Sequence, residues 1–548
     1  MNDGRGGFTS RFDARFAQPV TRDQTAIIGF RRSDGAAVVL AGSANYEDGL
    51  AVGAAVRQYD FSHQTIDDSF PGHASSTGPL ALADIDGDGD LDLFVGGRVL
   101  PGRYPEAASS RIFRTANGKW ELDAENSKAL ANVGLVSGAV WSDLNGDGFP
   151  ELILACEWGP VLAFKNERGT LRPWVPPVIS TAPITVGGSS TGAGGSPAPL
   201  NSRTGPGRSD GGSTLNDFTG LWNGITTGDI DGDGKLDIIA ANWGLNGPYH
   251  STPPQPLRLY YGDFAQRGQV DLIETQFDSD AQAVVPMRSL SPLANALPFL
   301  RERFPTHKLF SEAAIEDVLK ALPAPAKQVQ AATLASTIFF NRGDRFEAVE
   351  LPRGAQLAPA FGVCVADLDG DGFEDIFLSQ NFFATHSDMP RLDAGRGLLL
   401  RGDGKGRLVP MPGQESGLRI YGEQRGSAIG DFDADGRVDL VVTQNGAETR
   451  LFRNARAKAG LRVQLKGPPG NPTGIGAVIR LDYAAEKGPA REIHAGSGYW
   501  SQDSAVHVFG LRDGVARVVV QWPGGRSTTT DVPPRAKEVI IDQAGNLN

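Results

Sequence analysis

The sequence predicts an all-β fold, in which a β-propeller built from repeats is followed by a small C-terminal β domain. Three observations lead there. A short acidic motif recurs five times, and the segments on both sides of each copy have the residue types of β-strands. The chain also holds 70 Gly and 36 Pro in 548 residues, while 40% hydrophobic residues leave enough material for a core. These features are typical of short strands joined by many turns.

Charge and hydropathy exclude several classes. The formal net charge is -12 and Lys and Arg do not cluster, which argues against a nucleic-acid partner. No run of 18 apolar residues is present, so no membrane span is expected. The opening MNDGRGGFTSRFD lacks the apolar stretch of a secretory signal. Cys156 and Cys364 lie in apolar stretches and are expected to be buried hydrophobic residues rather than a redox pair, so they leave the compartment undecided.

The acidic motif has the pattern of a calcium loop. Each copy carries oxygen-bearing side chains at positions 1, 3, 5 and 9, glycine at position 6 and Leu or Ile at position 10. Alternate carboxylates on a tight turn can converge on one hard cation, the carbonyl of position 7 adds a ligand, and glycine permits the turn. We therefore expect about five Ca²⁺ sites. The predicted ligands are Asp84, Asp86, Asp88, Asp90 and Asp92; Asp143, Asn145, Asp147, Phe149 and Glu151; Asp229, Asp231, Asp233, Lys235 and Asp237; Asp367, Asp369, Asp371, Phe373 and Asp375; and Asp431, Asp433, Asp435, Arg437 and Asp439.

Two other interpretations of the motif are less consistent with its residues. An EF-hand needs a bidentate Glu at position 12 and a following helix, but position 12 is Val95, Leu154, Ala240, Leu378 and Val442, and the segments that follow resemble strands. Plain Asp- and Gly-rich turns would explain one copy, but five copies without a cation would place like charges at short range. These loops hold 21 of the 64 acidic residues, so the acidity is mostly predicted ligand.

Each loop is expected to join two strands of a four-stranded unit. Segments such as PLALAD and GVCVAD precede the loops, and a strand, Asn/Gly turn and strand follow about 20 to 30 residues later, as in RIFRTANGKWEL at 111 and LFRN at 451. Loop plus hairpin gives a unit of about 60 residues, the size of a propeller blade.

The loops resemble the FG-GAP or VCBS repeats of integrin alpha-type propellers, especially those of bacterial proteins similar to cartilage acidic protein. The resemblance covers about residues 1–455 and implies a seven-bladed propeller with calcium in loops on one face. Counting supports seven units if FRRSDGAAVVLAG at 30–42 and DFAQRGQVD from Asp263 are decayed copies. Alternatively, Asp263 to Asp271 belongs to the outer hairpin of the preceding unit.

Two segments interrupt this pattern. Residues 183–214 are Gly-, Ser- and Pro-rich and are expected to form a flexible surface loop, so GSSTG at 188–192 does not indicate a nucleophile elbow. Residues 287–325 switch to helical periodicity, with Leu297, Leu300 and Phe304 on one stripe and a helix start at Ser311. This insertion either braces the propeller or caps a binding surface.

The N-terminal residues have the pattern of a strand that pairs with a distant part of the chain. Residues 2–10 resemble the second half of a hairpin, and residues 451–454 resemble a first half. We expect the N-terminal strand to close the ring at the blade of Asp431, which would remove an exposed edge. The same observation suggests a truncated start.

Residues 460–545 predict a separate small β domain. Gly474-Ile-Gly-Ala, Gly496-Ser-Gly-Tyr499 with Ser501-Gln502, Phe509-Gly-Leu and Trp522-Pro-Gly-Gly resemble the ASPIC/UnbV domain that follows such propellers. The resemblance implies architecture rather than chemistry. Tyr499 and Trp500 are either packing residues at a sandwich edge or a platform for a glycan or a partner.

No catalytic residue is assigned. The seven His are scattered, and the sequence has no H-E-x-x-H and no P-loop. His250 and His386 lie in predicted loops, where a lone His is usually solvated. The sequence thus predicts a calcium-binding, secreted, periplasmic or cell-surface monomer that acts in recognition, adhesion or scaffolding with a protein or glycan ligand. A calcium-dependent polysaccharide lyase or hydrolase is the alternative.

Overall fold

The computed structural model describes residues 7–9, 16, 19–68, 70–116, 118–180, 213–386, 389–483, 486–512 and 515–548. The segment predicted to be a flexible loop, 183–214, lies outside the described residues except for its last two, and so does GSSTG at 188–192. In the part of the chain that the structure describes, no helix is long and apolar enough to cross a membrane.

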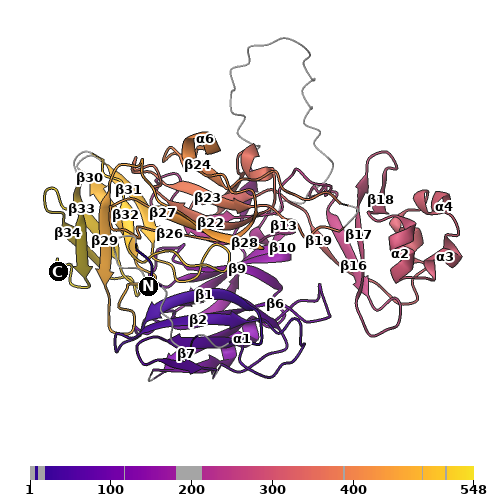
Figure 1. Cartoon of the computed structure of the whole chain (residues 1–548), viewed down its shortest axis with the longest axis horizontal. Coiled ribbons are helices and arrows are strands. Elements are labelled where there is room, and N and C mark those ends of the chain that lie inside the picture. Colours follow the sequence, from indigo (N-terminus) through magenta and orange to yellow (C-terminus); the bar gives the residue numbers. More distant parts are fainter. Residues whose placement is uncertain are drawn as a thin grey trace, which may run out of the picture.

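Six sheets follow one another along the chain and make up the region predicted to be a propeller, for which we keep that name (Figure 1). β-Strands dominate, as predicted. The sheets are, in order, β1 (Gln24–Arg31), β2 (Ala37–Ser43), β3 (Val56–Asp60) and β4 (Thr65–Asp67); β5 (Ser76–Ala83), β6 (Asp92–Val99), β7 (Arg111–Ala116) and β8 (Lys119–Asp123); β9 (Leu135–Ser142), β10 (Glu151–Glu167) and β11 (Thr170–Trp174), with β13 (Thr219–Leu221); β14 (Ile225–Gly228), β15 (Asp237–Ala240), β20 (Thr337–Asn341) and β21 (Phe346–Glu350), with β12 (Val178–Ser180); β22 (Ala360–Ala366), β23 (Asp375–Gln380), β24 (Leu398–Gly402) and β25 (Leu408–Met411); and β26 (Glu423–Gly430), β27 (Asp439–Asn445) and β28 (Ala447–Phe452).

The first strand of each sheet lies innermost. Contacts run from β1 to β5, β9, β14, β22 and β26 in that order, and β5, β9 and β22 are buried along their whole length. One of the five acidic loops follows each of five of these six strands, so the loops gather at one end of the inner strands. The residues that begin the first strands and those that end the second strands lie at the opposite end.

Strand β10 covers two blade positions, because its 17 residues fold back on themselves. Asn166 donates its side-chain N–H to the carbonyl of Pro150 at 3.1 Å, although a straight strand would separate residues 151 and 166 by about 50 Å. The reversal lies at Trp158, which has φ 55°, and Gly159. The third sheet therefore has the same four-position plan as its neighbours.

The blade predicted at Asp263 is wrong. Residues around Asp263 lie in a separate sheet of β16 (Leu257–Gly262), β17 (Asp271–Asp278), β18 (Ala283–Pro286) and β19 (Lys327–Ala331). This sheet and its helices, residues 257–331, which we call the arm, are inserted between β15 and β20 of one blade and project from the ring in Figure 1. The strands β14 and β22 of the flanking blades contact each other directly, so the arm takes no place in the ring. Within the described residues the count is six, and seven blades are not confirmed.

The helices of the arm pack on its sheet. They are α2 (Leu290–Ala296), α3 (Leu300–Arg303), α4 (His307–Ser311) and α5 (Ile315–Leu319). Leu297, Leu300 and Phe304 are buried as their periodicity predicts. The helix start predicted at Ser311 is wrong, because Thr306 caps α4 by accepting the N–H of Leu309 at 3.2 Å, and Ser311 ends that helix.

Short helical elements also lie in the propeller: α1 (Ala124–Ala129), α6 (Gly413–Ser416) and the 3-10 turns at Leu215–Asp217 and Arg353–Gln356. Near the N-terminus, the ring of Phe8 lies 5.8 Å from that of Phe432, in the blade of Asp431. This places residue 8 at the blade with which we expect it to pair. The strand pairing itself stays a prediction, because residues 1–6 and 10–15 lie outside the described ranges.

The C-terminal domain consists of two packed sheets. One holds β29 (Leu461–Lys466) between β32 (His507–Phe509) and β35 (Glu538–Asp542). The other runs β31 (Lys487–Glu492), β30 (Val478–Tyr483), β33 (Val515–Gln521) and β34 (Ser527–Asp531). The domain lies at the opposite end of the molecule from the arm (Figure 1).

Candidate metal centres

The five acidic loops share one hydrogen-bond pattern. In each, an oxygen of the position-1 aspartate accepts the N–H of the position-6 glycine at 2.8 to 3.0 Å. The position-5 carboxylate accepts the N–H of position 7 at 2.8 to 3.0 Å. The position-6 glycines have φ between 81° and 92°, a region that a side chain disfavours. The backbone therefore presents the carboxylates of positions 1, 3 and 5 on the same side of each turn.

Four loops bring three carboxylates within reach of one ion. The oxygens of each group lie within 4.8 Å of one another. The groups are Asp84, Asp86 and Asp88; Asp229, Asp231 and Asp237; Asp367, Asp369 and Asp371; and Asp431, Asp433 and Asp439. In the loop of Asp143, position 3 is Asn145, whose amide donates to Glu151 at 2.8 Å. Positions 1 and 3 thus lie together in all four groups, joined by position 5 in the loops of Asp84 and Asp367 and by position 9 in the loops of Asp229 and Asp431.

The position-9 carboxylates have a structural task as well. One oxygen accepts the N–H of position 2, and the other accepts an N–H from the third strand of the same blade, as in Asp237, which bonds Ile230 at 3.0 Å and Asn341 at 2.8 Å. Asp92, Glu151, Asp375 and Asp439 repeat this arrangement. Position 9 therefore fixes the loop to its own blade.

Burial disfavours the charged form of the carboxyl groups in these loops. Desolvation raises the pKa of Asp84 and Asp229 to about 6 and the pKa of Asp92 and Asp143 to about 7, because the charged form loses water. The Oδ1 of Asp229 is buried and has no hydrogen-bond partner among the described residues. A cation with oxygen ligands fits this combination of all-oxygen donors, burial and an unsatisfied acceptor.

Arginines that the sequence analysis missed border four of the loops. Arg114 contacts Asp86 at 2.7 Å, Arg342 contacts Asp231 at 2.5 Å, and Arg401 contacts Asp369 at 2.7 Å. Arg453 contacts Asp433 at 2.5 Å. All four come from the third strand of a blade or the residues just after it, in segments that the sequence predicts only as hairpins. They balance charge on the solvent side of the loops.

Asparagines in the same hairpins link consecutive loops. Asn341 donates to the carbonyl of Leu144 in the preceding loop at 2.8 Å and to that of Leu236 in its own loop at 3.3 Å. Asn166 and Asn454 make the equivalent pairs of bonds. The sequence signal was present, since FKNERG, FFNRGD and LFRNAR all contain this Asn. These side chains couple neighbouring metal loops around the ring.

We expect Asn341→Ala to lower the free energy of unfolding by about 1–3 kcal/mol, because it leaves two buried carbonyls without donors. Denaturant unfolding in calcium measures the change. Asn246→Ala is the matched control, since Asn246 is exposed and makes a single bond to the carbonyl of Leu357. Equal stability of the two variants would contradict a coupling role for Asn341.

The C-terminal domain lies on the metal loops. It bonds the position-1 carboxylate of four loops: Gln521 Nε2 donates to Asp143 at 3.0 Å, the N–H of Ala490 to Asp229 at 2.9 Å, the N–H of Gly510 to Asp367 at 2.9 Å, and Arg462 pairs with Asp431. At the fifth loop, Gly470 packs so closely on Asp90 that an added Cβ would lie 1.9 Å from its Oδ1. The predicted metal face is thus an interface within the chain.

A buried ion pair strengthens this interface. Arg491 of β31 donates to Oε1 of Glu374, at position 8 of the Asp367 loop, at 2.7 and 3.0 Å. Both side chains are almost completely buried. Removing one partner of such a pair leaves an uncompensated buried charge, so the pair fixes the docking geometry.

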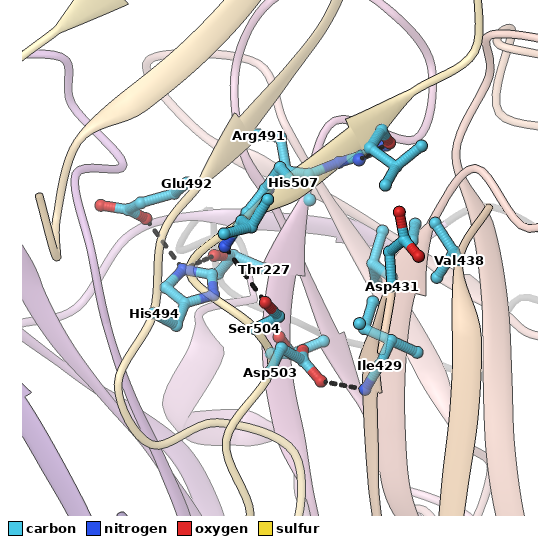
Figure 2. A pocket seen from close by; sticks show the side chains of 17 residues that line it. Thr227, Ile429, Asp431, Val438, Arg491, Glu492, His494, Asp503, Ser504 and His507 are labelled. Atoms are coloured by element: carbon cyan, nitrogen blue, oxygen red, sulfur yellow. Dashed lines mark hydrogen bonds and ion pairs between the residues drawn. The ribbon is translucent and has the colours of Figure 1, made fainter. Parts of the chain in front are cut away.

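A small polar cavity of about 40 Å³ lies beside it, between β14, β22, β26 and the C-terminal domain (Figure 2). His494 Nε2 lies 3.0 Å from Glu492 and 3.2 Å from the hydroxyl of Thr227. Burial lowers the pKa of His507 well below its usual value and raises the pKa of Asp503 to about 6. The contact between the propeller and the domain is therefore partly polar.

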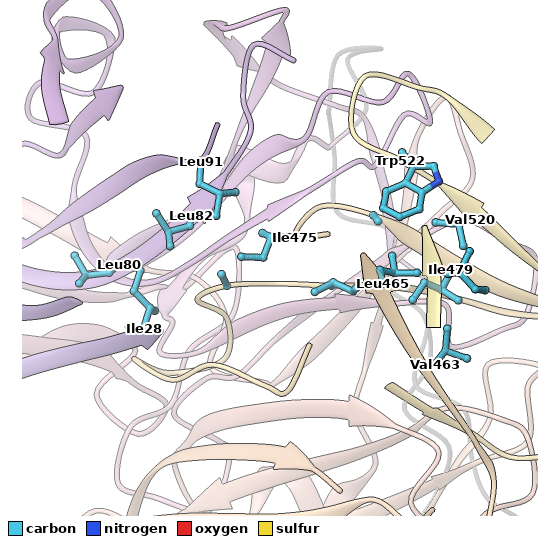
Figure 3. Close-up of a cluster of buried hydrophobic side chains, with 14 of the residues drawn as sticks. Ile28, Leu80, Leu82, Leu91, Val463, Leu465, Ile475, Ile479, Val520 and Trp522 are labelled. Carbon is cyan, nitrogen blue, oxygen red and sulfur yellow. The ribbon is translucent and has the colours of Figure 1, made fainter. Parts of the chain in front are cut away.

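Apolar packing joins the two parts as well. One core cluster contains Ile28, Leu80, Leu82 and Leu91 of the propeller together with Val463, Leu465, Ile475 and Trp522 of the domain (Figure 3). Each such side chain contributes about 1.5–3 kcal/mol when it is removed from water. Propeller and domain therefore form one packed body.

The domain also inserts a hairpin along the axis of the ring. Residues 495–504, which we call the axial finger, contact all six inner strands. Ala495 accepts the N–H of Leu82 at 2.7 Å, and Gly498 exchanges two bonds with Ile225. The remaining contacts are Gln502 with Gly29, Ser504 with Ile429, Trp500 with Ser137 and Gly498 with the backbone of Val363. Ser497 N–H bonds Ser501 O at 3.1 Å, so the chain turns back at Gly498 to Trp500.

Residues 467–547, which include the finger, match the family model described as ASPIC and UnbV. The C-terminal domain is an ASPIC/UnbV domain. The sequence prediction for this domain is confirmed. The expectation that Tyr499 and Trp500 lie at a sandwich edge is wrong, because both residues belong to the finger inside the ring.

Cartilage acidic protein 1 matches a part of the chain. The protein from Mus musculus is 26% identical over 203 residues, which is 36% of this chain and 31% of the relative, and the one from Homo sapiens is 27% identical over 203 residues, 36% and 30%. The matched region thus spans less than a third of these relatives. The rhamnogalacturonan lyases YesW and YesX align over 79% of this chain and 72% of theirs, at 14% and 12% identity and with TM-scores of 0.26 and 0.25.

Proposed function

We propose that this protein is a calcium-stabilised recognition module, built on FG-GAP repeats, whose calcium ions hold the ASPIC/UnbV domain on the propeller. Ca²⁺ bound in a loop would neutralise the carboxylates of positions 1, 3 and 5. The same loops contact the domain, so their geometry sets the docking surface. The molecule then acts as a rigid scaffold that presents its remaining surfaces to a ligand.

The observation that carries this proposal is the set of bonds from the domain to the position-1 carboxylates. These bonds use one oxygen of Asp229 or Asp367 and leave other loop oxygens for an ion. An integral interface is a poor place for exchange with soluble ligands. Structural calcium is therefore favoured over a catalytic or signalling ion.

Calcium fits better than magnesium because these loops offer carboxylates and carbonyls in numbers that suit six to eight ligands, whereas magnesium keeps several waters. Extracellular calcium modules bind at about 0.1–1 mM. We accordingly propose a secreted, periplasmic or cell-surface location, where calcium reaches such concentrations.

Calcium titration tests the metal assignment. We expect Asp233→Ala and Asp371→Ala each to lower the number of bound calcium ions by one, because position 5 supplies a ligand in each loop. Equilibrium dialysis gives the stoichiometry. Asp263→Ala is the control: Asp263 also accepts the N–H groups of residues four and five positions on, at 2.7 and 2.8 Å, but its loop has no carboxylates at positions 3 and 5. Unchanged stoichiometry in both loop variants would refute the assignment.

The lyase or hydrolase alternative stays a prediction. Release of unsaturated sugars from a polysaccharide would support a lyase, and release of saturated reducing sugars would support a hydrolase. Ligand binding without turnover would support the recognition module.

A further inference from the structure

The tip of the axial finger reaches the end of the ring that lies opposite the metal loops. Gly498 pairs with Ile225, the first residue of β14, and the backbone of Tyr499 lies against Gly426, near the start of β26. The rings of Tyr499 and Trp500 stack 4.8 Å apart at an angle of 10°. The ASPIC/UnbV domain thus docks on one face and delivers two aromatic side chains to the other.

A continuous row of aromatic rings begins at this tip. Tyr499 lies 5.3 Å from Phe361, and Phe361 lies 6.3 Å from Phe382. Trp243 continues the row, 5.0 Å from Phe382 and 6.0 Å from Tyr249 at the base of the arm. We call these rings, with Trp500, the aromatic row. Tyr499, Trp500, Phe382, Trp243 and Tyr249 are partly exposed, whereas Phe361 is buried beneath Arg425.

Two acid–guanidinium pairs flank the row. Arg98 pairs with Glu157, which also accepts the hydroxyl of Tyr104 at 2.7 Å. Arg425 pairs with Glu423 at 2.5 Å and lies 4.0 Å above the ring of Phe361. Burial raises the pKa of Tyr499, and both pairs act on the same phenol, the arginines lowering its pKa and the glutamates raising it. All four charged side chains therefore act electrostatically on Tyr499.

Two further observations distinguish this cluster from ordinary packing. Trp158, Asn381 and Trp500 have φ of 55°, 91° and 56°, and all three lie here. Such conformations are unfavourable for non-glycine residues and gather at functional sites. In addition, Trp243 Nε1 is buried without a hydrogen-bond partner among the described residues. The cluster thus combines three unfavourable backbone conformations with an indole N–H that is free to bind a ligand.

We propose that the aromatic row and its two flanking pairs form a binding site for neutral glycans. The C–H faces of a pyranose ring are apolar and stack on aromatic rings, while its hydroxyl groups bond to carboxylates and guanidinium groups. Each guanidinium is already neutralised by a glutamate, so the site favours uncharged hydroxyl groups over the carboxylate of a uronic acid. This inference rests on the proposed function and deepens it by naming the ligand surface.

An array of immobilised neutral and uronate-containing oligosaccharides, probed with the full chain in calcium, tests it. We expect neutral glycans to bind, with Trp243→Ala and Glu157→Gln weakening the best one at least tenfold in a fluorescence titration. Tyr46→Ala, an exposed aromatic outside the row, is expected to bind as the parent protein does. If one of these variants has a lowered melting temperature, Arg425→Lys is tested in its place. This variant keeps the charge but loses the planar stack on Phe361, so it is expected to weaken binding as well.

The inference is overturned if no neutral glycan binds, if only uronate-containing glycans bind, or if binding stays within twofold of the parent in all folded variants. If the glycan inference fails but the melting temperature still depends on calcium, the metal proposal is unaffected. If melting does not depend on calcium but glycans bind at the aromatic row, the metal proposal fails and the glycan site stands.

Discussion

Chelation of calcium with EGTA is expected to lower the melting temperature of this protein by about 2–6 °C. A site with a dissociation constant of about 0.1–1 mM contributes about 0.4–1.4 kcal/mol at 1 mM calcium, so five sites contribute about 2–7 kcal/mol. With an unfolding entropy of about 2.1 cal/mol/K per residue, each kcal/mol shifts the melting temperature of a packed body of this length by about 0.9 °C. Chelation also removes the positive charge of the ion from buried position-1 carboxylates such as Asp84 and Asp143.

Differential scanning calorimetry measures the shift, and readdition of cations identifies the ion. We expect calcium to restore the melting temperature and magnesium at the same concentration to leave it low. An EGTA melt identical to the calcium melt would refute structural metal in these loops. Full recovery with magnesium would contradict the assignment to calcium.

The second large effect is expected from Gly496→Ala. Gly496 has φ 98°, and a Cβ there would lie 2.1 Å from the carbonyl oxygen of Leu80 and 2.8 Å from the Cα of Ala81. Backbone atoms of an inner strand cannot yield as a flexible side chain does. We expect a loss of about 2–5 kcal/mol, which combines left-handed strain with overpacking.

Gly446→Ala separates the two contributions. Gly446 also has a positive φ, 66°, but a Cβ added there would meet no heavy atom within 4 Å. This variant should lose only about 1–2 kcal/mol, the strain alone. Denaturant unfolding of both variants in calcium gives the difference. If Gly496→Ala is no worse than Gly446→Ala, the finger is not tightly held within the ring.

The geometry of the acidic loops was predictable because their information is local. Ligand positions 1 to 9 span nine residues, so spacing and a glycine at position 6 suffice to place carboxylates on one turn. The same holds for the strands on either side and for the ASPIC/UnbV domain, whose motifs lie within one stretch. Asp263 shows the limit: its Asp and Gly spacing copies a loop, yet its strands belong to the arm, because the pairing of β15 with β20 skips the intervening residues.

The partners of each loop could not be predicted in the same way. Arg114 and Asn341 are ordinary hairpin residues in the sequence, and only the third strand's position beside the loop gives them a role. Asp229 and Ala490 are separated by 261 residues, and Gly29 and Gln502 by 473. No periodicity connects such positions.

The sequence by itself determined the acidic loops, the strand-rich class and the nature of the C-terminal domain, because each depends on residues close together in the chain. Only the tertiary structure decided the ring of six described blades, the burial of the metal face beneath the ASPIC/UnbV domain and the passage of Tyr499 and Trp500 to the far end of the axis. The physical reason is that burial and backbone pairing between distant segments depend on how the six sheets pack around the axial finger.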